Sequence, residues 1–234
     1  MRLRHRWDLA PAEAVALQAR IRDRVETRDR LEPVRYVAGV DVGFEQDGAV
    51  TRAAVAVLAV PGLQLADFSV ARLPTRFPYV PGLLSFREIP ALLRALARLR
   101  VTPQLVLCDG QGVAHPRRVG LASHLGLVAD LPAIGVAKTL LLGHHRAVPN
   151  RKGAWSPLFD AGEVIGAALR TRADAKPVFV SVGHRVCLET AIGWTMACVT
   201  RFRLPETTRW AHRLASGSEA DGRCQARRFR PGRA

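Results

Sequence analysis

Two acidic residues interrupt apolar runs that have the composition of buried β-strands. Asp41 follows residues 36–40, Asp109 follows residues 104–108, and small residues come next in both places. A carboxylate within an apolar strand is costly to bury unless it is paired or coordinates a cation. If neighbouring strands bring Asp41 and Asp109 together, their oxygen atoms form a credible magnesium site.

A third apolar run ends in a basic residue. Residues 131–137 have the pattern of a short buried strand and lead directly into Lys138. Buried strands with charges at their ends usually converge on a site. We therefore expect Lys138 near the two acids, beside a cleft lined by the residues that follow Asp109, among them Gly110 and His115.

Helix and strand patterns predict one α/β domain over residues 1–214, followed by a basic, flexible tail over residues 215–234. Three antiparallel strands come first, and the Asp47-Gly48 pair supplies the turn between the first two. The predicted strands are residues 35–45, 50–60, 63–73, 104–109, 131–138, 162–171 and 177–182, and the predicted helices are residues 8–32, 85–99, 118–128, 187–200 and 204–214. Residues 140–160 show no regular pattern. This order of elements indicates a ribonuclease H-like fold with a central mixed sheet flanked by helices. A meander with an acid on its first strand comes first, followed by a helix, a strand with a second acid, a helix and another strand.

The loop of residues 74–82 contains three prolines and holds Tyr79 outside regular structure. In a basic protein, a rigid loop with an aromatic side chain indicates base stacking or insertion between bases. The alternative, a tyrosine that covers the core, is equally open at this point.

Residues 85–88 have the S-x-x-E pattern of a capping box at the start of a helix. On this spacing alone, Glu88 is favoured as a helix cap. The alternative is that Glu88 contributes a third carboxylate to the metal site.

The composition indicates a globular protein with a polyanionic partner. The net charge is +15, with 48% hydrophobic and 24% charged residues. A nucleic acid partner explains this excess of basic over acidic residues better than a membrane surface or solubility alone. No apolar run is long enough to span a membrane and no signal-peptide pattern opens the chain, so we expect a soluble, cytoplasmic protein, monomeric by default. None of the four cysteines forms a C-x-x-C pair, which argues against a disulfide or zinc framework.

A series of short motifs, in order along residues 36–211, resembles that of the endonuclease V family. Any one of them is weak, but the full series is specific. The motifs are Gly39-Val40-Asp41-Val42-Gly43-Phe44, Pro78-Tyr79-Val80-Pro81-Gly82, Leu84-Ser85-Phe86-Arg87-Glu88, Asp109-Gly110-Gln111-Gly112, His115-Pro116-Arg117, Gly135-Val136-Ala137-Lys138, Gly183-His184-Arg185-Val186 and Arg203-Leu204-Pro205-Glu206-Thr207-Thr208-Arg209-Trp210.

The resemblance implies a DNA repair endonuclease that recognises deoxyinosine, the product of adenine deamination. Such an enzyme hydrolyses the second phosphodiester bond 3′ to the lesion and leaves a 3′-hydroxyl and a 5′-phosphate. It requires Mg²⁺, for which Mn²⁺ substitutes. An inosine-specific endoribonuclease is the near alternative, and a non-catalytic protein that binds lesions or junctions is an alternative of another class.

The resemblance also assigns roles to residues. It places the metal on Asp41, Glu88 and Asp109, against the capping role favoured by spacing, and puts His115 and Lys138 near the scissile phosphate as further catalytic residues. It makes Tyr79 the wedge that fills the gap left by an extruded base. The DNA-binding residues that it implies are Pro78, Tyr79, Val80, Pro81, Gly82, Leu84, Gly110 and Leu121. Roles for Gln111 and His184 stay open.

Overall fold

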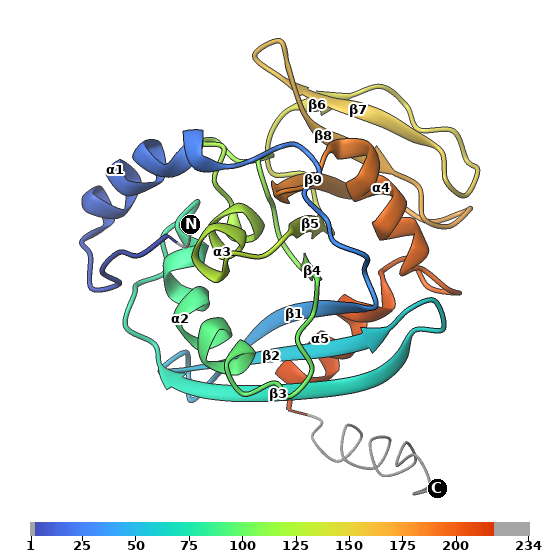
Figure 1. Ribbon diagram of the computed structural model, residues 1–234. Helices are drawn as coiled ribbons and strands as arrows, with labels where there is room; N and C mark the ends of the chain where they lie inside the picture. The colour runs from blue at the N-terminus through green and yellow to red at the C-terminus, as the bar shows by residue number, and fades with distance from the viewer. Residues whose placement is uncertain (1–2, 218–234) are drawn as a thin grey trace, which may run out of the picture.

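One mixed nine-stranded sheet runs through the computed structural model, which describes residues 3–217 (Figure 1). The strand order is β3-β2-β1-β4-β5-β9-β8-β7-β6. The strands are β1 (Tyr36–Glu45), β2 (Val50–Ala59), β3 (Gln64–Pro74), β4 (Leu105–Cys108), β5 (Ala133–Ala137), β6 (His144–His145), β7 (Trp155–Asp160), β8 (Glu163–Leu169) and β9 (Val178–His184). The helices are α1 (Pro11–Ile21, continued by a 3₁₀ turn at Arg22–Arg24), α2 (Leu84–Leu96), α3 (Leu121–Ala129), α4 (Leu188–Ala197) and α5 (Glu206–Ala215).

The first half of the sheet has the predicted ribonuclease H-like order. β1, β2 and β3 form an antiparallel meander, and β4 and β5 then add in parallel beside β1. β9 returns antiparallel to β5, and β8, β7 and β6 extend the sheet from there. The α/β class and the mixed sheet are therefore confirmed.

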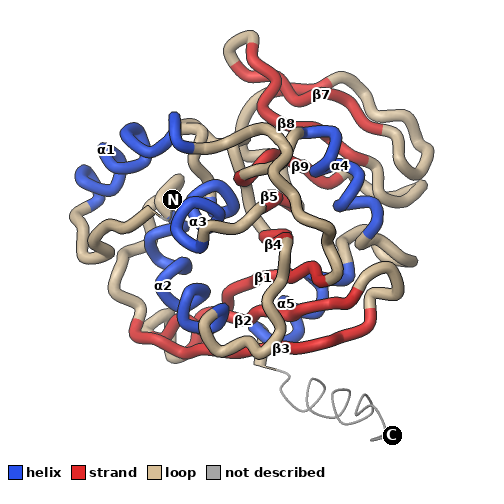
Figure 2. The backbone as a smooth tube through the Cα atoms, viewed as in Figure 1, coloured by secondary structure: helices blue, strands red, loops and turns tan. Residues whose placement is uncertain are grey.

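Helices cover both faces of the sheet, with α1, α2 and α3 on one side and α4 and α5 on the other (Figures 1 and 2). The sequence of β2 explains why both faces are covered. Its small and β-branched side chains alternate: Val55 and Val57 pack into the core beneath α2, while Ala54 and Ala56 pack against Leu214 of α5. A strand that is apolar on both faces is stable only between two layers.

Helix α5 lies unusually close to β1 because of a glycine. A Cβ atom on Gly39 would stand 2.0 Å from the carbonyl oxygen of Thr207 at the start of α5. Only a residue without a side chain permits this approach. The close packing brings the last turns of α5 beside Asp41, two residues further along β1.

Two predicted segments are wrong in extent. The helix predicted over residues 8–32 ends at Arg24, because the chain beyond it forms hydrogen bonds with the turn at Arg185 instead of with itself. The Arg185 N–H donates to the Glu26 carbonyl (2.6 Å), and the Arg30 N–H donates to the Arg185 carbonyl (3.0 Å). Within residues 140–160, predicted to be irregular, β7 pairs with β8; its pattern is masked by Pro157 and depends on a partner strand rather than on local periodicity.

Three cysteines lie within the described residues, Cys108, Cys187 and Cys198, and all are free; the first and last are buried and Cys187 is partly buried. No helix in residues 3–217 combines the length and apolar character needed to cross a membrane. The predicted basic tail lies, apart from residues 215–217, outside the described residues.

Candidate active site

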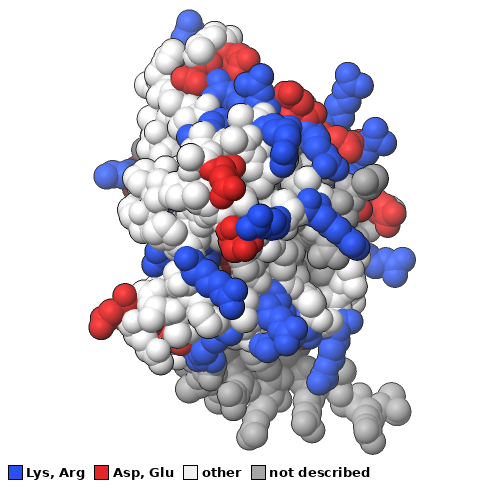
Figure 3. Space-filling view, turned by 90° about the vertical axis from the view of Figure 1, so that its left-hand side faces the viewer, with Lys and Arg blue, Asp and Glu red and all other residues white. Residues whose placement is uncertain are grey.

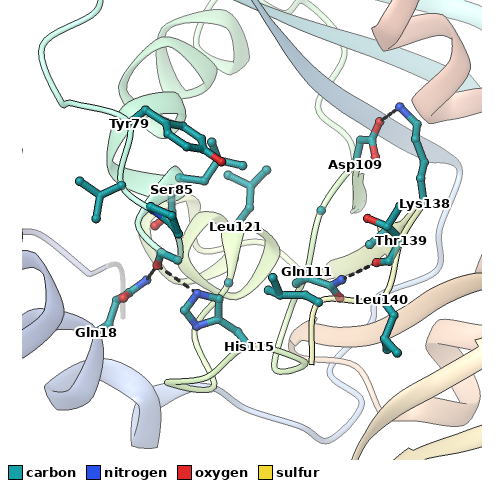
Figure 4. Close-up of a pocket in the computed structure, with 18 residues that line it drawn as sticks. Gln18, Tyr79, Ser85, Asp109, Gln111, His115, Leu121, Lys138, Thr139 and Leu140 are labelled. Carbon is teal, nitrogen blue, oxygen red and sulfur yellow. Dashed lines mark hydrogen bonds and ion pairs between the residues drawn. The ribbon is translucent and has the colours of Figure 1, made fainter. Parts of the chain in front are cut away.

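A pocket of about 380 Å³ opens between the loop before α2, the start of α3 and the ends of β4 and β5 (Figure 4). It brings together nearly all the residues that the resemblance implied as DNA-binding: Tyr79, Val80, Pro81, Gly82, Leu84, Gly110 and Leu121. Pro78, predicted with them, is not among its lining residues. Sequence reasoning missed Gln18, Ser85, Gly120, Ala137, Thr139, Leu140 and Leu141, which also line it.

The three predicted carboxylates lie next to this pocket and interact with one another. β1 and β4 are parallel with Val40 opposite Cys108, so that Asp41 and Asp109 follow paired positions. Glu88 approaches from α2, on a neighbouring element. Burial, followed by the charges of Asp41 and Asp109, raises the pKa of Glu88 to about 8, and burial and Asp109 likewise raise the pKa of Asp41.

Glu88 is not a helix cap, so the capping-box prediction is wrong. The helix begins at Leu84 with Leu83 as its N-cap, and Ser85 is already inside it. The turn that precedes α2 is closed by the backbone, since the Leu83 N–H donates to the Val80 carbonyl (3.0 Å). Within residues 3–217 the Glu88 carboxylate has no hydrogen-bond or ion-pair partner, although its residue is only 7% exposed.

Two basic side chains contact the other carboxylates. Lys138 forms an ion pair with Asp109, as the predicted convergence of the strand ends requires (Figure 4). Nδ1 of His212, on α5, lies 2.7 Å from Oδ2 of Asp41. His212 was missed because its proximity to Asp41 depends on how α5 docks on β1, and because the motif resemblance stopped at Ala211, one residue earlier.

Among residues 3–217, no group of three or more His, Cys, Asp and Glu side chains is positioned to hold a metal ion. The chemistry of the donors nevertheless fits Mg²⁺ or Mn²⁺, which favour carboxylate oxygen over sulfur. A buried, unpartnered carboxylate at Glu88, beside two acids that repel it, is the arrangement that a divalent cation stabilises. Asp41, Glu88 and Asp109 therefore fit the ion implied by the motifs.

His115 is fully engaged in holding the pocket wall. Its Nε2 lies 3.0 Å from the Gly82 carbonyl, and its Nδ1 accepts from the Arg117 N–H (3.2 Å). Because a carbonyl only accepts, Nε2 carries the proton and the ring is neutral. Burial and Arg117 lower the pKa of His115 to about 4, in agreement with this state.

The same Gly82 carbonyl accepts two further hydrogen bonds, from Nε2 of Gln18 (3.1 Å) and a guanidinium nitrogen of Arg117 (2.8 Å). Gly82 has φ of +77°, a conformation that favours glycine. Three donors thus fix the end of the loop that carries Tyr79, whose side chain is 73% exposed. An exposed ring excludes the alternative in which Tyr79 covers the core.

The two residues whose roles were open occupy different places. Gln111 lines the pocket, donates from Nε2 to the Thr139 carbonyl (3.2 Å), and has no partner for its buried Oε1 within the described chain. His184 is 3% exposed and lies outside the pocket, where it packs on α3 and accepts from the Glu26 N–H (3.2 Å). His184 is therefore a packing residue.

Fold and site together define the class: a nuclease of ribonuclease H-like architecture, with a carboxylate cluster beside a pocket. Comparison with known proteins identifies the family. The model of the family described as Endonuclease V matches residues 19–213 of this chain. The endonuclease V of Roseiflexus sp. (strain RS-1) is 60% identical over 210 residues, which cover 90% of this chain and 94% of that protein.

Solved structures give the same result. The crystal structure of endonuclease V from Streptomyces avermitilis has a TM-score of 0.87 and 43% identity, and the match covers 95% of this chain and 98% of that one. Endonuclease V of Ciona intestinalis, solved in complex with a 24mer DNA containing an inosine followed by a ribo-adenosine, has a TM-score of 0.78 and 28% identity over 90% of this chain and 98% of that one. The chain belongs to the endonuclease V family, as its motifs predicted, and is a nuclease.

Proposed function

We propose that this protein is a DNA repair endonuclease that recognises deoxyinosine and hydrolyses the second phosphodiester bond 3′ to it, leaving a 3′-hydroxyl and a 5′-phosphate. The observation that carries the proposal is the shared wall between pocket and carboxylates: Asp109 lines the pocket and also belongs to the acidic cluster. A base held in the pocket therefore places its own strand beside the acids. The inosine-containing DNA bound by the Ciona protein supports this choice of substrate.

The pocket accepts a base only after that base leaves the helix. Extrusion costs a few kcal/mol and is cheapest for a mispaired base such as hypoxanthine. Tyr79, exposed on its anchored loop, is placed to stack in the gap. Gly82 and Gly110 leave the backbone of the pocket wall accessible, with Leu84 and Leu121 as its apolar surface.

Asp41, Glu88 and Asp109 would hold Mg²⁺, or Mn²⁺ in its place. When bound, the ion neutralises the phosphodiester and lowers the pKa of water. His212 orients the Asp41 carboxylate through its hydrogen bond. Lys138, 39% exposed beside Asp109, is placed to stabilise negative charge that develops on the phosphate. His115, predicted as a further catalytic residue near the scissile phosphate, also lines the pocket and holds the carbonyl of Gly82 through Nε2.

The protein surface suits a polyanion. Figure 3 shows a face on which Lys and Arg side chains outnumber acidic ones, consistent with a net charge of +15 for the chain. Such a surface attracts a nucleic acid backbone without regard to sequence. The presence of Asp41, Glu88 and Asp109 together argues against a non-catalytic binder. A single copy of the chain contains every group invoked here.

The test is a nicking assay on two labelled DNA strands that differ only in one deoxyinosine or deoxyadenosine, with Mg²⁺ or EDTA. We expect one cut, one nucleotide beyond the lesion, only in the inosine strand and only with metal. Asp41→Ala should reduce the rate at least about 100-fold, because it removes a proposed metal ligand. Unchanged nicking by that variant would rule out the assigned centre, and equal cutting of both strands would rule out the assigned substrate. The same strand made as RNA decides between the two nucleic acids.

A further inference from the structure

A chain of hydrogen bonds, buried at its inner end, runs from the wall of the pocket to the N-terminal segment. Ser85 lines the pocket (Figure 4), and its Oγ lies 3.0 Å from Nδ1 of His124 on α3. Nε2 of His124 lies 2.8 Å from Nε2 of His5. Nδ1 of His5 lies 2.6 Å from the carbonyl oxygen of Arg6. The proposed catalytic chemistry uses none of these groups.

The carbonyl at one end sets the direction of every donor in this chain. The Arg6 carbonyl only accepts, so the proton of His5 resides on Nδ1 and its Nε2 accepts. His124 must then donate from Nε2, which leaves its Nδ1 as an acceptor. Ser85 consequently donates its single hydroxyl proton to His124.

This direction holds because both imidazoles are neutral. His124 is fully buried, and a charged ring there would have no acidic partner in the chain of contacts. Burial, followed by the neighbouring His5, lowers the pKa of His124 to about 3, and burial lowers the pKa of His5. Trp7 and Phe86 pack against the His124 ring and hold it in place.

A serine whose proton is committed to His124 offers only lone pairs to the pocket. Hypoxanthine attached to a sugar has one N–H donor, at N1, whereas adenine carries a lone pair at the same position. An acceptor-only wall therefore attracts the first base and repels the second.

We propose that Ser85, oriented by His124 and His5, distinguishes deoxyinosine from deoxyadenosine by accepting a hydrogen bond from N1–H. This inference rests on the proposed function and adds the contact that selects the base. Ser85 is the specificity-determining residue, and the two histidines are positioning residues. Purines that bear N1–H fit the same contact, and purines that lack it do not.

The test compares deoxyinosine with deoxynebularine, whose purine lacks both O6 and the N1 proton, in otherwise identical DNA strands. Binding is measured by fluorescence anisotropy with Ca²⁺ and single-turnover nicking with Mg²⁺. In Ser85→Ala the preference for inosine should fall about 3- to 10-fold in both assays, the range of one neutral hydrogen bond. The change should come from the inosine strand alone.

His5→Phe tests the relay from outside the pocket. Phenylalanine keeps the ring that packs on Trp7 but removes the acceptor for His124. His124 is then free to carry its proton on Nδ1, and the Ser85 hydroxyl is free to donate into the pocket. We expect the inosine preference to fall about 2- to 5-fold, a change in base selectivity that a purely structural role of His5 would not produce.

Ser123→Ala is the matched control, because Ser123 is equally buried, adjacent to His124 and outside the pocket lining, and its hydroxyl has no partner within residues 3–217. Its inosine preference should equal that of the wild type. If the wild-type protein favours inosine and both Ser85→Ala and His5→Phe keep the same preference, the proposed relay is wrong while the proposed substrate stands. If the wild-type protein binds the two strands equally, the proposed substrate is wrong and the relay falls with it.

Discussion

At the scale of single residues, the site is defined by groups that are costly to place where they are. Glu88 is buried, lacks a partner among residues 3–217, and is repelled by Asp41 and Asp109. A fold retains such an arrangement when a bound ion or substrate compensates for it. Tyr79 is costly for the opposite reason, because an aromatic residue is left 73% exposed to solvent instead of being buried.

Tyr79→Ala is expected to reduce nicking of an inosine strand about 5- to 150-fold, because stacking of a base on an aromatic side chain contributes about 1–3 kcal/mol. Its free energy of unfolding should stay within about 0.5 kcal/mol of wild type, since the ring makes few contacts within the protein. Trp155→Ala, which removes another exposed aromatic outside the pocket lining, is the control and should nick normally. A large loss of stability in Tyr79→Ala, with activity unchanged, would mean that the ring serves folding and not the wedge.

At the scale of elements, the loop before α2 depends on residues that are remote in sequence. Gln18, on α1, donates to the carbonyls of Gly82 and Val119 and accepts from Nε of Arg117 (2.5 Å). One buried side chain thereby ties α1, the Tyr79 loop and the start of α3 together.

Gln18→Ala should destabilise the protein by about 1–3 kcal/mol, because it leaves a buried carbonyl and a guanidinium nitrogen without their partner. It should also weaken binding of the inosine strand, raising KM more than it lowers kcat, since the wall of the pocket loosens while the acids stay in place. Gln104→Ala is the matched control: Gln104 Oε1 accepts from the backbone of Arg35 and Tyr36, far from the pocket lining. The control should lose stability but keep its KM; an equal rise of KM in both variants would contradict a specific role for Gln18.

Local patterns predicted the elements that carry the chemistry and failed where partners lie far away in the chain. The meander, β4 and β5 have strong apolar periodicity and clear turns, so Asp41, Asp109 and Lys138 could be placed in advance. The S-x-x-E pattern misled, because the backbone turn at Leu83 starts α2 before Ser85 can cap it. Gln18, His124 and His212 carry no local signal, since each acquires its role only when α1, α3 or α5 docks.

At the scale of the whole molecule, three buried histidines link stability to pH. Burial lowers the pKa values of His115 and His184 to about 4 and that of His124 to about 3. Between about pH 6.5 and 4 these three side chains therefore bind more protons in the unfolded chain than in the native protein, and their contribution to stability falls as pH falls.

Each of these histidines should contribute up to about 1.4 kcal/mol per pH unit to that loss. Guanidinium unfolding with Mg²⁺ at pH 7, 6 and 5 measures the slope. His184→Asn keeps an acceptor for the Glu26 N–H. It should lower the number of protons taken up on unfolding, which sets the slope, by about one. His144→Asn, at an exposed position on β6, is the control for the substitution itself; equal slopes in wild type and His184→Asn would contradict the neutral, buried state of His184.

The measurement that bears most directly on the carboxylate cluster is a calorimetric titration of Mn²⁺ into wild-type protein and Glu88→Gln, paired with nicking of the inosine strand at the same metal concentrations. Glutamine keeps the size of the side chain and removes its charge. We expect the affinity for Mn²⁺ to fall at least about 10-fold, and nicking at least about 100-fold, because a negatively charged ligand of the ion is replaced by a neutral amide. Wild-type affinity together with wild-type nicking in Glu88→Gln would contradict the assignment of Asp41, Glu88 and Asp109 as one metal-dependent centre.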